Sequence, residues 1–163
     1  MTDKLSPIDH PAHPLRVLFL CTHNSSRSQM AEGLLQARGG ADYEVFSAGT
    51  QPRSVHPLAI QAMRELGIDI SNHRAKGIEE FRAQPPMDLV VTVCDAAAET
   101  CPFFPNARHQ EHWGFPDPSA VTGSEHERLA AFRQVRDAIA ARLALFLEQE
   151  KDASAPLDAS TGA

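Results

Sequence analysis

The chain of 163 residues is 42% hydrophobic and 22% charged, a composition typical of one ordinary globular domain, and this leaves little room for a second. Its formal net charge of −6 excludes a general attraction to nucleic acid or to an anionic membrane, so any bound anion must be held by locally placed donors. No stretch approaches the roughly 20 apolar residues of a membrane span, and the polar start is unlike a signal peptide, so we expect a cytoplasmic protein.

The first predicted elements are a strand, a loop and a helix. The continuous apolar run of residues 17–20 is typical of a strand buried on both faces of a parallel sheet. Apolar residues then recur at helical spacing after Arg27, with Ser28 as the expected N-cap and an end before Gly39. The residues between strand and helix therefore lie at a strand-loop-helix junction.

The later elements continue this alternation. We expect strands over residues 43–47 and 89–93, and a short strand near residues 109–113. A helix is predicted from His56, and a long amphipathic helix over about residues 125–148. The apolar face of the helix from His56 is expected to comprise Ala59, Ile60, Met63 and Leu66. The alternation predicts an α/β fold, a three-layer sandwich around a central, mainly parallel four-stranded sheet.

This pattern also predicts the domain organisation. Residues 15–150 are expected to form a single catalytic domain. Residues 1–14 and 151–163 are polar and lack an apolar period, so we expect two flexible terminal segments.

Cys21 and Arg27 are six positions apart at the first strand-loop-helix junction. The residues between them can curl so that successive backbone N–H groups point inward at the positive end of a helix dipole, which favours a tetrahedral oxyanion. Arg27 adds a planar fork that grips two oxygens, and the same donors favour the thiolate of Cys21, to which Ser28 can donate a further hydrogen bond. The residues expected to bind the oxyanion are Thr22, His23, Asn24, Ser25, Ser26, Arg27 and Ser28.

The chain over about residues 15–148 resembles the low-molecular-weight tyrosine phosphatase fold and the arsenate reductases that share it. The motifs behind this resemblance are Cys21 to Arg27 with Ser28, Met30-Ala31-Glu32-Gly33, Ser47-Ala48-Gly49, Ile70-Ser71-Asn72-His73 and His112-Trp113-Gly114-Phe115-Pro116-Asp117-Pro118. The resemblance implies that Cys21 is the nucleophile, Arg27 the oxyanion ligand and Asp117 the general acid. A carboxyl group facing the thiolate could also protonate a leaving oxygen on chemical grounds alone.

Cys94 and Cys101 distinguish a reductase from a phosphatase. A phosphatase needs one thiol, whereas a reductase must supply two electrons and therefore needs more. Thioredoxin-coupled arsenate reductases carry a similar cysteine pair, which implies a Cys21/Cys94/Cys101 disulfide relay that reduces arsenate to arsenite and is recharged by thioredoxin. Seven helical steps of 1.5 Å separate two residues by roughly 10 Å, beyond the disulfide limit of about 7 Å, so residues 95–100 are expected to rearrange when the bond forms.

Several other functions stay open on the sequence alone. A protein tyrosine or small-molecule phosphatase would need only Cys21, Arg27 and Asp117. The tyrosine phosphatases that the chain resembles usually carry aromatic residues just after Asp-Pro, however, and Ser119 at this place favours a small inorganic substrate. A sensor that binds phosphate or arsenite without turnover is a further class. The two later cysteines could instead be buried apolar residues, or zinc ligands in a set comprising Cys94, Cys101, His109 and His112. We expect no metal or cofactor, phosphate and sulfate as competing oxyanions, and no nucleic-acid or membrane partner.

A cation site is a last expectation from the resemblance. Asn24, Glu32 and Ser47 are similar to residues that hold potassium beneath the oxyanion loop in some relatives. Lys76 stands where some of those relatives have an Asp, and its ammonium could replace the ion by pairing with Glu32. The sequence therefore predicts an activity that is insensitive to potassium.

Overall fold

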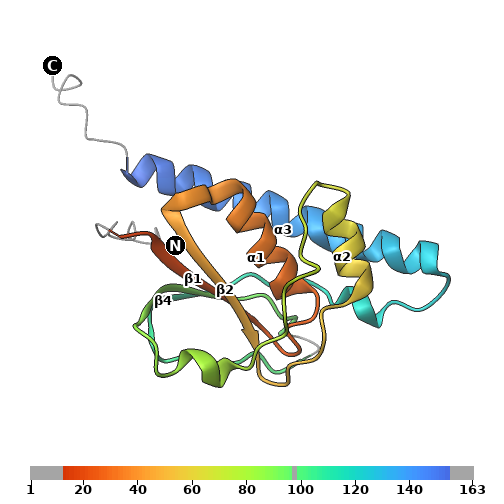
Figure 1. Cartoon of the computed structure of the whole chain (residues 1–163), viewed down its shortest axis with the longest axis horizontal. Helices are drawn as coiled ribbons and strands as arrows, with labels where there is room; N and C mark the ends of the chain where they lie inside the picture. Colours follow the sequence, from red (N-terminus) through yellow and green to blue (C-terminus); the bar gives the residue numbers. More distant parts are fainter. Residues whose placement is uncertain (1–12, 97–98, 155–163) are drawn as a thin grey trace, which may run out of the picture.

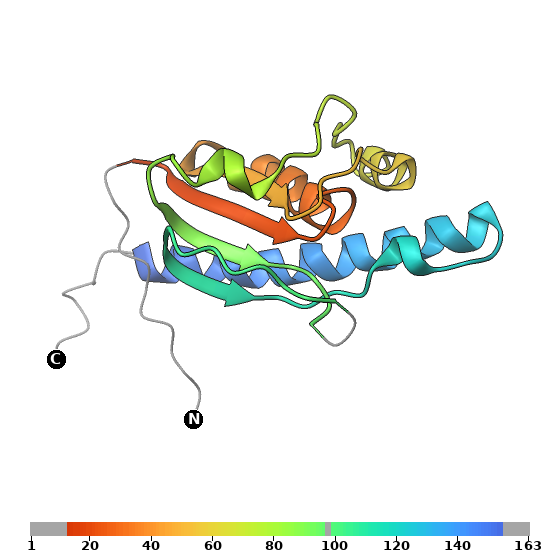
Figure 2. The ribbon, with the colours of Figure 1, turned by 90° about the horizontal axis from the view of Figure 1, so that it is seen from below.

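The computed structural model describes residues 13–96 and 99–154, and in this part the chain forms a four-stranded sheet. The strands are β1 (Leu15–Cys21), β2 (Tyr43–Gly49), β3 (Met87–Thr92) and β4 (Ala107–His112). Their order is β2-β1-β3-β4 and every neighbouring pair is parallel. In Figure 2 the arrows of β1, β3 and β4 point toward the same end of the molecule. The predicted α/β class is confirmed, with a sheet that is parallel throughout.

Helices cover the two faces of the sheet unequally. One face carries α1 (Arg27–Gly39), α2 (Pro57–Arg64) and the long α3 (Glu125–Ser154). Helix α3 packs against both α1 and α2. The other face is covered by a thinner layer that includes the short helix η2 (Ile78–Phe81), as Figure 1 shows below the sheet. The short helices η1 (Gly40–Asp42) and η3 (Pro118–Ala120) lie in connections. Together the helices, the sheet and the thinner layer make the three layers of the sandwich.

The apolar run of β1 is explained by burial on both faces. Val17 and Phe19 belong to the core cluster shared with α1, α2 and α3, whereas Leu18 and Leu20 belong to the cluster shared with η2 and Phe104. Successive strand side chains point to opposite faces, so a central strand with both faces covered must be apolar at every position. The edge strand β4 is mostly polar and exposed, which discourages pairing with another sheet.

The structure moves several predicted helix boundaries. The N-cap of α1 is Ser26 rather than Ser28, because the Ser28 hydroxyl bonds within the preceding loop and its backbone is already helical. The helix from His56 ends at Arg64, since the chain turns at Gly67 with a φ of 75°. Leu66 therefore leaves the predicted apolar face and is 40% exposed. Helix α3 reaches Ser154, beyond the predicted end at residue 148.

Residues 151–154 of the expected C-terminal tail are thus helical, and residues 13 and 14 of the expected N-terminal segment are exposed and belong to no helix or strand. The remainder of both predicted segments, residues 1–12 and 155–163, lies outside the described residues. Within the described ranges no helix has both the length and the apolar character needed to cross a membrane.

Gly49, at the end of β2, allows the oxyanion loop to approach the sheet. A Cβ atom at this position would lie 2.6 Å from the Thr22 carbonyl oxygen and 2.8 Å from the Asn24 amide nitrogen, both of them backbone atoms. Its own N–H donates to the Lys76 carbonyl at 2.9 Å. Only glycine fits between these two segments, and this accounts for the glycine of the Ser47-Ala48-Gly49 motif.

Candidate active site

Cys21 ends β1 at the carboxyl edge of the sheet, where its thiol is buried and free. The Asn24 N–H donates to Cys21 Sγ at 3.1 Å, and the Ser28 hydroxyl lies 2.9 Å from the same sulfur. The predicted contact between Ser28 and Cys21 is therefore present. The sulfur is thus held in place by the first residues of the loop and of α1.

Asn24 braces the loop that follows Cys21. It is fully buried and has a φ of 50°, a left-handed conformation that asparagine tolerates better than most residues. Its Nδ2 donates to Ser28 Oγ at 2.8 Å, while its Oδ1 accepts from the Lys76 N–H at 2.8 Å and from Gln29 Nε2 at 3.0 Å. The side-chain amide thus joins the loop, the first turn of α1 and the segment before η2.

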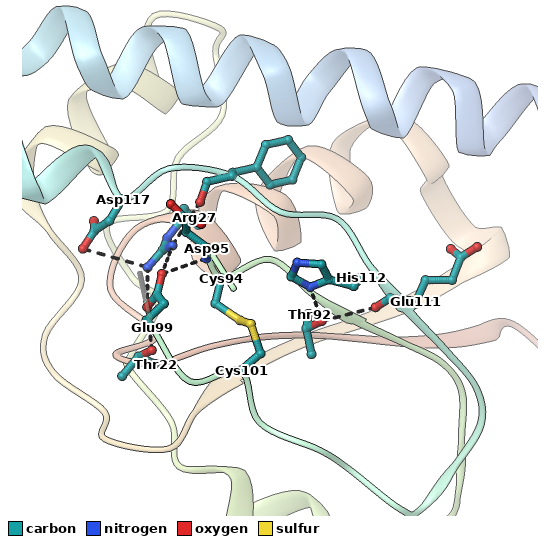
Figure 3. The surroundings of a disulfide bond; sticks show 11 residues. Thr22, Arg27, Thr92, Cys94, Asp95, Glu99, Cys101, Glu111, His112 and Asp117 are labelled. Carbon is teal, nitrogen blue, oxygen red and sulfur yellow. Dashed lines mark hydrogen bonds and ion pairs between the residues drawn. A yellow bond between two sulfur atoms is a disulfide. The ribbon is translucent and has the colours of Figure 1, made fainter. Parts of the chain in front are cut away.

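Arg27, the first residue of α1, lies between two carboxylates (Figure 3). Its side chain is only 4% exposed. Nη1 donates to Glu99 Oε1 and, at 3.1 Å, to the Phe115 carbonyl, while Nη2 donates to Glu99 Oε2 at 3.2 Å. Asp117 Oδ2 is 3.9 Å from Nη2. The sequence motif predicted this arginine, but not the carboxylate that binds it.

Glu99 accepts two hydrogen bonds besides those from Arg27. The Thr22 hydroxyl donates to Glu99 Oε2 at 2.7 Å, and the Asp95 N–H donates to Oε1 at 2.9 Å. Burial of the carboxyl opposes its ionisation, but the hydrogen bonds from these donors and from Arg27 outweigh burial and hold the Glu99 pKa at about 2. The only sequence signal that Glu99 could bind Arg27 is its position between Cys94 and Cys101, the two candidate relay cysteines.

A cavity of about 350 Å³ opens over Cys21 and Arg27. It is also lined by His23, Ser25, Ser26, Arg53, Ser54, His56, Pro57, Asp117 and Ser119. The side chains of Thr22, Asn24 and Ser28 are outside this lining, since Thr22 binds Glu99 and the other two brace the loop. The motif did not predict Arg53 or His56 at the cavity, because their segment is placed there by backbone hydrogen bonds to the loop. The Arg53 N–H donates to the His23 carbonyl at 2.9 Å, and the His56 N–H donates to the Ser25 carbonyl at 2.9 Å.

Asp117 lies at the cavity, as the resemblance implied. Its Oδ1 accepts from the Ser119 N–H at 2.9 Å and from the Ser119 hydroxyl at 2.7 Å, which leaves Oδ2 on the side of Arg27. His56 lines the same cavity, and its pKa is lowered mainly by burial and further by Arg128, with Asp117 acting in the opposite sense. A carboxyl and a largely neutral imidazole therefore face the space above the Cys21 thiol.

Cys94 and Cys101 are joined in a disulfide, with Cα atoms 5.9 Å apart. Cys94 is fully buried and comes two residues after the end of β3. The Val93 N–H donates to the Leu20 carbonyl at 2.9 Å, so the backbone just before Cys94 lies beside the end of β1. Cys101 is partly exposed. The pair is thus bonded rather than two separate apolar cysteines. Residues 97 and 98, inside the segment predicted to rearrange, lie outside the described residues.

The predicted zinc set is only partly brought together. Donor atoms of Cys94, Cys101 and His112 lie within 4.8 Å of one another, but His109 is not in this group. His112 Nδ1 is 2.7 Å from Thr92 Oγ1. Zinc binds cysteine as a thiolate, and the two sulfurs are bonded to each other in this form, so these residues do not fit a structural zinc site here.

Glu32, the carboxylate of the potassium site expected from the resemblance, already has an imidazole and an ammonium group beside it. His73 Nδ1 lies 2.9 Å from Glu32 Oε2, and Lys76 Nζ lies 4.0 Å from Oε1. Burial lowers the pKa of Lys76, and the charge of Glu32 counteracts this. Ser47 Oγ is buried without a hydrogen-bond partner in the described part of the chain. The paired carboxylate fits a potassium ion poorly, and potassium insensitivity stays a prediction.

Comparisons with known proteins agree with this geometry. Residues 16–155 match the family model described as low molecular weight phosphotyrosine protein phosphatase. An arsenate reductase from Halalkalibacterium halodurans is 45% identical over 83% of this chain and 96% of its own length. A solved arsenate reductase in the phosphate-binding state is 32% identical, with a TM-score of 0.67, over 83% of this chain and 98% of that one. A thioredoxin-dependent arsenate reductase from Corynebacterium glutamicum is 27% identical, with a TM-score of 0.65, over 88% of this chain and 65% of that one.

Proposed function

Because the chain belongs to the low molecular weight phosphotyrosine protein phosphatase family and is similar to arsenate reductases, we propose that it reduces arsenate to arsenite through a three-cysteine relay. The observation that carries the proposal is the bonded pair Cys94–Cys101 at the same sheet edge as the free, hydrogen-bonded thiol of Cys21. A hydrolytic phosphatase has no need of that pair.

In the first step the Cys21 thiolate attacks arsenic. Loop amides and Arg27 hold the arsenate oxygens, and these donors stabilise the charge that develops as the S–As bond forms. Asp117 supplies a proton to the departing hydroxyl, which leaves as water. His56 and Arg53 lie on the cavity wall, where an imidazole and a guanidinium can orient the remaining oxygens.

In the second step the Cys94 thiolate attacks the sulfur of Cys21. A Cys21–Cys94 disulfide forms, the electron pair of the S–As bond passes to arsenic, and As(V) becomes As(III), which leaves as arsenite. The thiolate of Cys101 then attacks Cys94 and frees Cys21 as a thiolate. The product is the Cys94–Cys101 disulfide, so the structure corresponds to the oxidised end of this cycle.

A dithiol must then return two electrons and two protons to this disulfide. Thioredoxin is our proposed donor, because a structurally similar arsenate reductase is thioredoxin-dependent and the partly exposed Cys101 offers a sulfur to an attacking thiolate. Phosphate and sulfate, which share the tetrahedral shape of arsenate, are expected to compete for the site. We propose the cytoplasm, where such a donor keeps thiols reduced, as its location.

The phosphatase alternative retains Cys21, Arg27 and Asp117 and makes the other cysteines dispensable. Arsenate-dependent NADPH oxidation with thioredoxin and its reductase separates the two reactions, using wild type, Cys94→Ser and Cys101→Ser. Loss of turnover in both variants, with phosphate binding within about twofold of the reduced wild type, is expected from the relay. Rapid cleavage of p-nitrophenyl phosphate without any turnover of arsenate would instead establish the phosphatase.

A further inference from the structure

Glu99 occupies one edge of the Arg27 guanidinium, the edge formed by Nη1 and Nη2. Both hydrogens of Nη1 are taken, one by Glu99 Oε1 and the other by the Phe115 carbonyl, and Nη2 also donates to Glu99. The bidentate contact between Glu99 and the guanidinium has the geometry with which arginine binds a tetrahedral anion. In the disulfide form, therefore, an oxyanion cannot bind the Nη1/Nη2 edge of Arg27 without displacing Glu99.

The charges around Arg27 reinforce this effect. Glu99 and Asp117 are both within ion-pair distance of the one guanidinium, so two carboxyl groups share a single positive charge. The Glu99 carboxylate is 19% exposed and stays ionised well below neutral pH, since its pKa is held at about 2. An incoming dianion would meet a guanidinium whose charge the Glu99 carboxylate already offsets.

Glu99 lies in the loop that the disulfide closes. Glu99 is two residues before Cys101 and five after Cys94, so the bond between the cysteines closes the short loop that carries it. Within that loop the Glu99 N–H donates to the Asp95 carbonyl at 2.9 Å, and the Asp95 N–H donates back to Glu99 Oε1 at 2.9 Å. Thr22 Oγ1 then ties the carboxylate to the oxyanion loop itself. These contacts place the carboxylate on Arg27 while the disulfide is intact.

We propose that Glu99 is an internal competitor of the oxyanion: in the disulfide form its carboxylate holds Arg27 and weakens anion binding, and reduction of Cys94–Cys101 releases it. A dithiol donor supplies two electrons and two protons, the S–S bond breaks, and the loop is free to withdraw Glu99 from Arg27. The inference rests on the proposed function in taking Arg27 as the anion ligand and the disulfide as redox-active. It adds an order of events, in which the oxidised enzyme must be reduced before it binds arsenate well.

Glu99 also has a place in the chemistry of the cycle. Arsenate bound to the oxidised enzyme would face Cys21 without a thiolate to resolve the adduct, because Cys94 and Cys101 are bonded to each other. A carboxylate that lowers anion affinity in this form alone prevents such an unproductive complex. Glu99 is thus a positioning residue that acts on substrate through Arg27.

Calorimetric titration with inorganic phosphate tests the proposal on the full chain in both redox forms. We expect reduction to strengthen phosphate binding by wild type at least about tenfold, since one bidentate ion pair is released. In Glu99→Gln and Glu99→Ala the disulfide form should bind phosphate about as tightly as the reduced form. Thr22→Val, which removes one hydrogen bond to the carboxylate and keeps its charge, should give an intermediate value.

Glu79→Gln is the matched control, because it removes the same charge from an exposed carboxylate on η2 and should leave the redox difference unchanged. Thiol counting confirms that each oxidised variant has formed the Cys94–Cys101 bond. Equal phosphate affinity of the two wild-type forms, or a redox difference that persists in both Glu99 variants, would overturn the proposal. Phosphate binding needs no reduction of arsenate, so this result is independent of whether the relay turns over.

Discussion

The oxyanion loop and the segment from Cys94 to Cys101 lie side by side at the carboxyl edge of the sheet, but they are held in different ways. In the loop, the buried Asn24 donates to and accepts from three other segments, and Gly49 packs against its backbone. In the cysteine segment, the side chain of Glu99 accepts the hydrogen bonds from Thr22 and Arg27, and one disulfide closes the segment.

This difference matches the tasks of the two regions in the proposed reaction. A site that stabilises a transition state must be organised before the substrate arrives, because reorganising donors during the reaction consumes the stabilisation they offer. A thiol relay must change partners, and a segment held by few contacts changes shape at low cost. The predictions below test first the chemistry of the loop, then its rigidity, and then the dependence of the neighbouring segment on its redox state and on Glu99.

Cys21→Ser should have the largest effect. A hydroxyl in place of the thiolate removes the nucleophile, so arsenate turnover should fall by at least about 10⁴-fold. Phosphate affinity of the reduced protein should change by less than about threefold, because Arg27 and the loop amides remain. Steady-state NADPH oxidation and calorimetry measure the two quantities, and a variant that keeps more than a hundredth of wild-type turnover contradicts the role of Cys21.

Asn24→Ala should destabilise the whole domain. It leaves buried partners such as the Lys76 N–H without an acceptor and puts alanine at a φ of 50°, so the free energy of unfolding should drop by about 3 kcal/mol. Asn24→Gly keeps the positive φ without strain and should be roughly 1 kcal/mol less destabilising. Urea denaturation measures both, and two equal values would mean that the backbone conformation contributes little.

Hydrogen exchange should separate the two regions when the disulfide is reduced. The amides of Asp95, Ala96, Glu99 and Thr100 should change their protection at least about tenfold, because the segment rearranges. Amides of the first turns of α1 should change much less. Identical protection of the cysteine segment in both redox states would contradict the rearrangement.

The contact between Glu99 and Arg27 should give the oxidised protein a specific pH dependence. The folded-state pKa of Glu99, about 2, lies below its ordinary value of 4.5, so the ionised carboxylate stabilises the fold above pH 4.5 and loses this effect as the pH falls through about 2. The difference in Tm between wild type and Glu99→Gln should be constant from about pH 7 to pH 5 and shrink toward pH 2. A difference that stays the same across this range would show that the charge of Glu99 does not stabilise the fold.

Lys76→Asp should have the smallest effect. Wild-type turnover should not respond to potassium, since the ammonium of Lys76 and His73 already accompany Glu32. The aspartate variant should gain a potassium stimulation of about two- to fivefold, because a cation then offsets two carboxylates. Turnover assays in potassium and in tetramethylammonium chloride make the comparison, and a marked stimulation of the wild type would contradict the prediction.

The sequence by itself determined the parts of this protein that depend on local pattern. Both-face burial of β1 required the apolar run before Cys21, and the spacing of Cys21 and Arg27 located an anion loop, because strand, loop and helix follow one another in the chain. Helix ends were less predictable. Ser28 has the chemistry of an N-cap, but its hydroxyl is used by Cys21 and Asn24, and such long-range demands are invisible in a window of a few residues.

Only the tertiary structure decided what surrounds Arg27. Glu99 comes 72 positions later in the chain, and only its place between two candidate cysteines sets it apart from a solvated carboxylate. It meets Arg27 because β3 lies beside β1 and the Cys94–Cys101 bond closes the loop that carries it. Arg53 and His56 reach the cavity for a similar reason, through backbone bonds to the loop. The effect of a charged side chain depends on the groups next to it, and for Arg27 and Glu99 these groups come together only when distant strands pair.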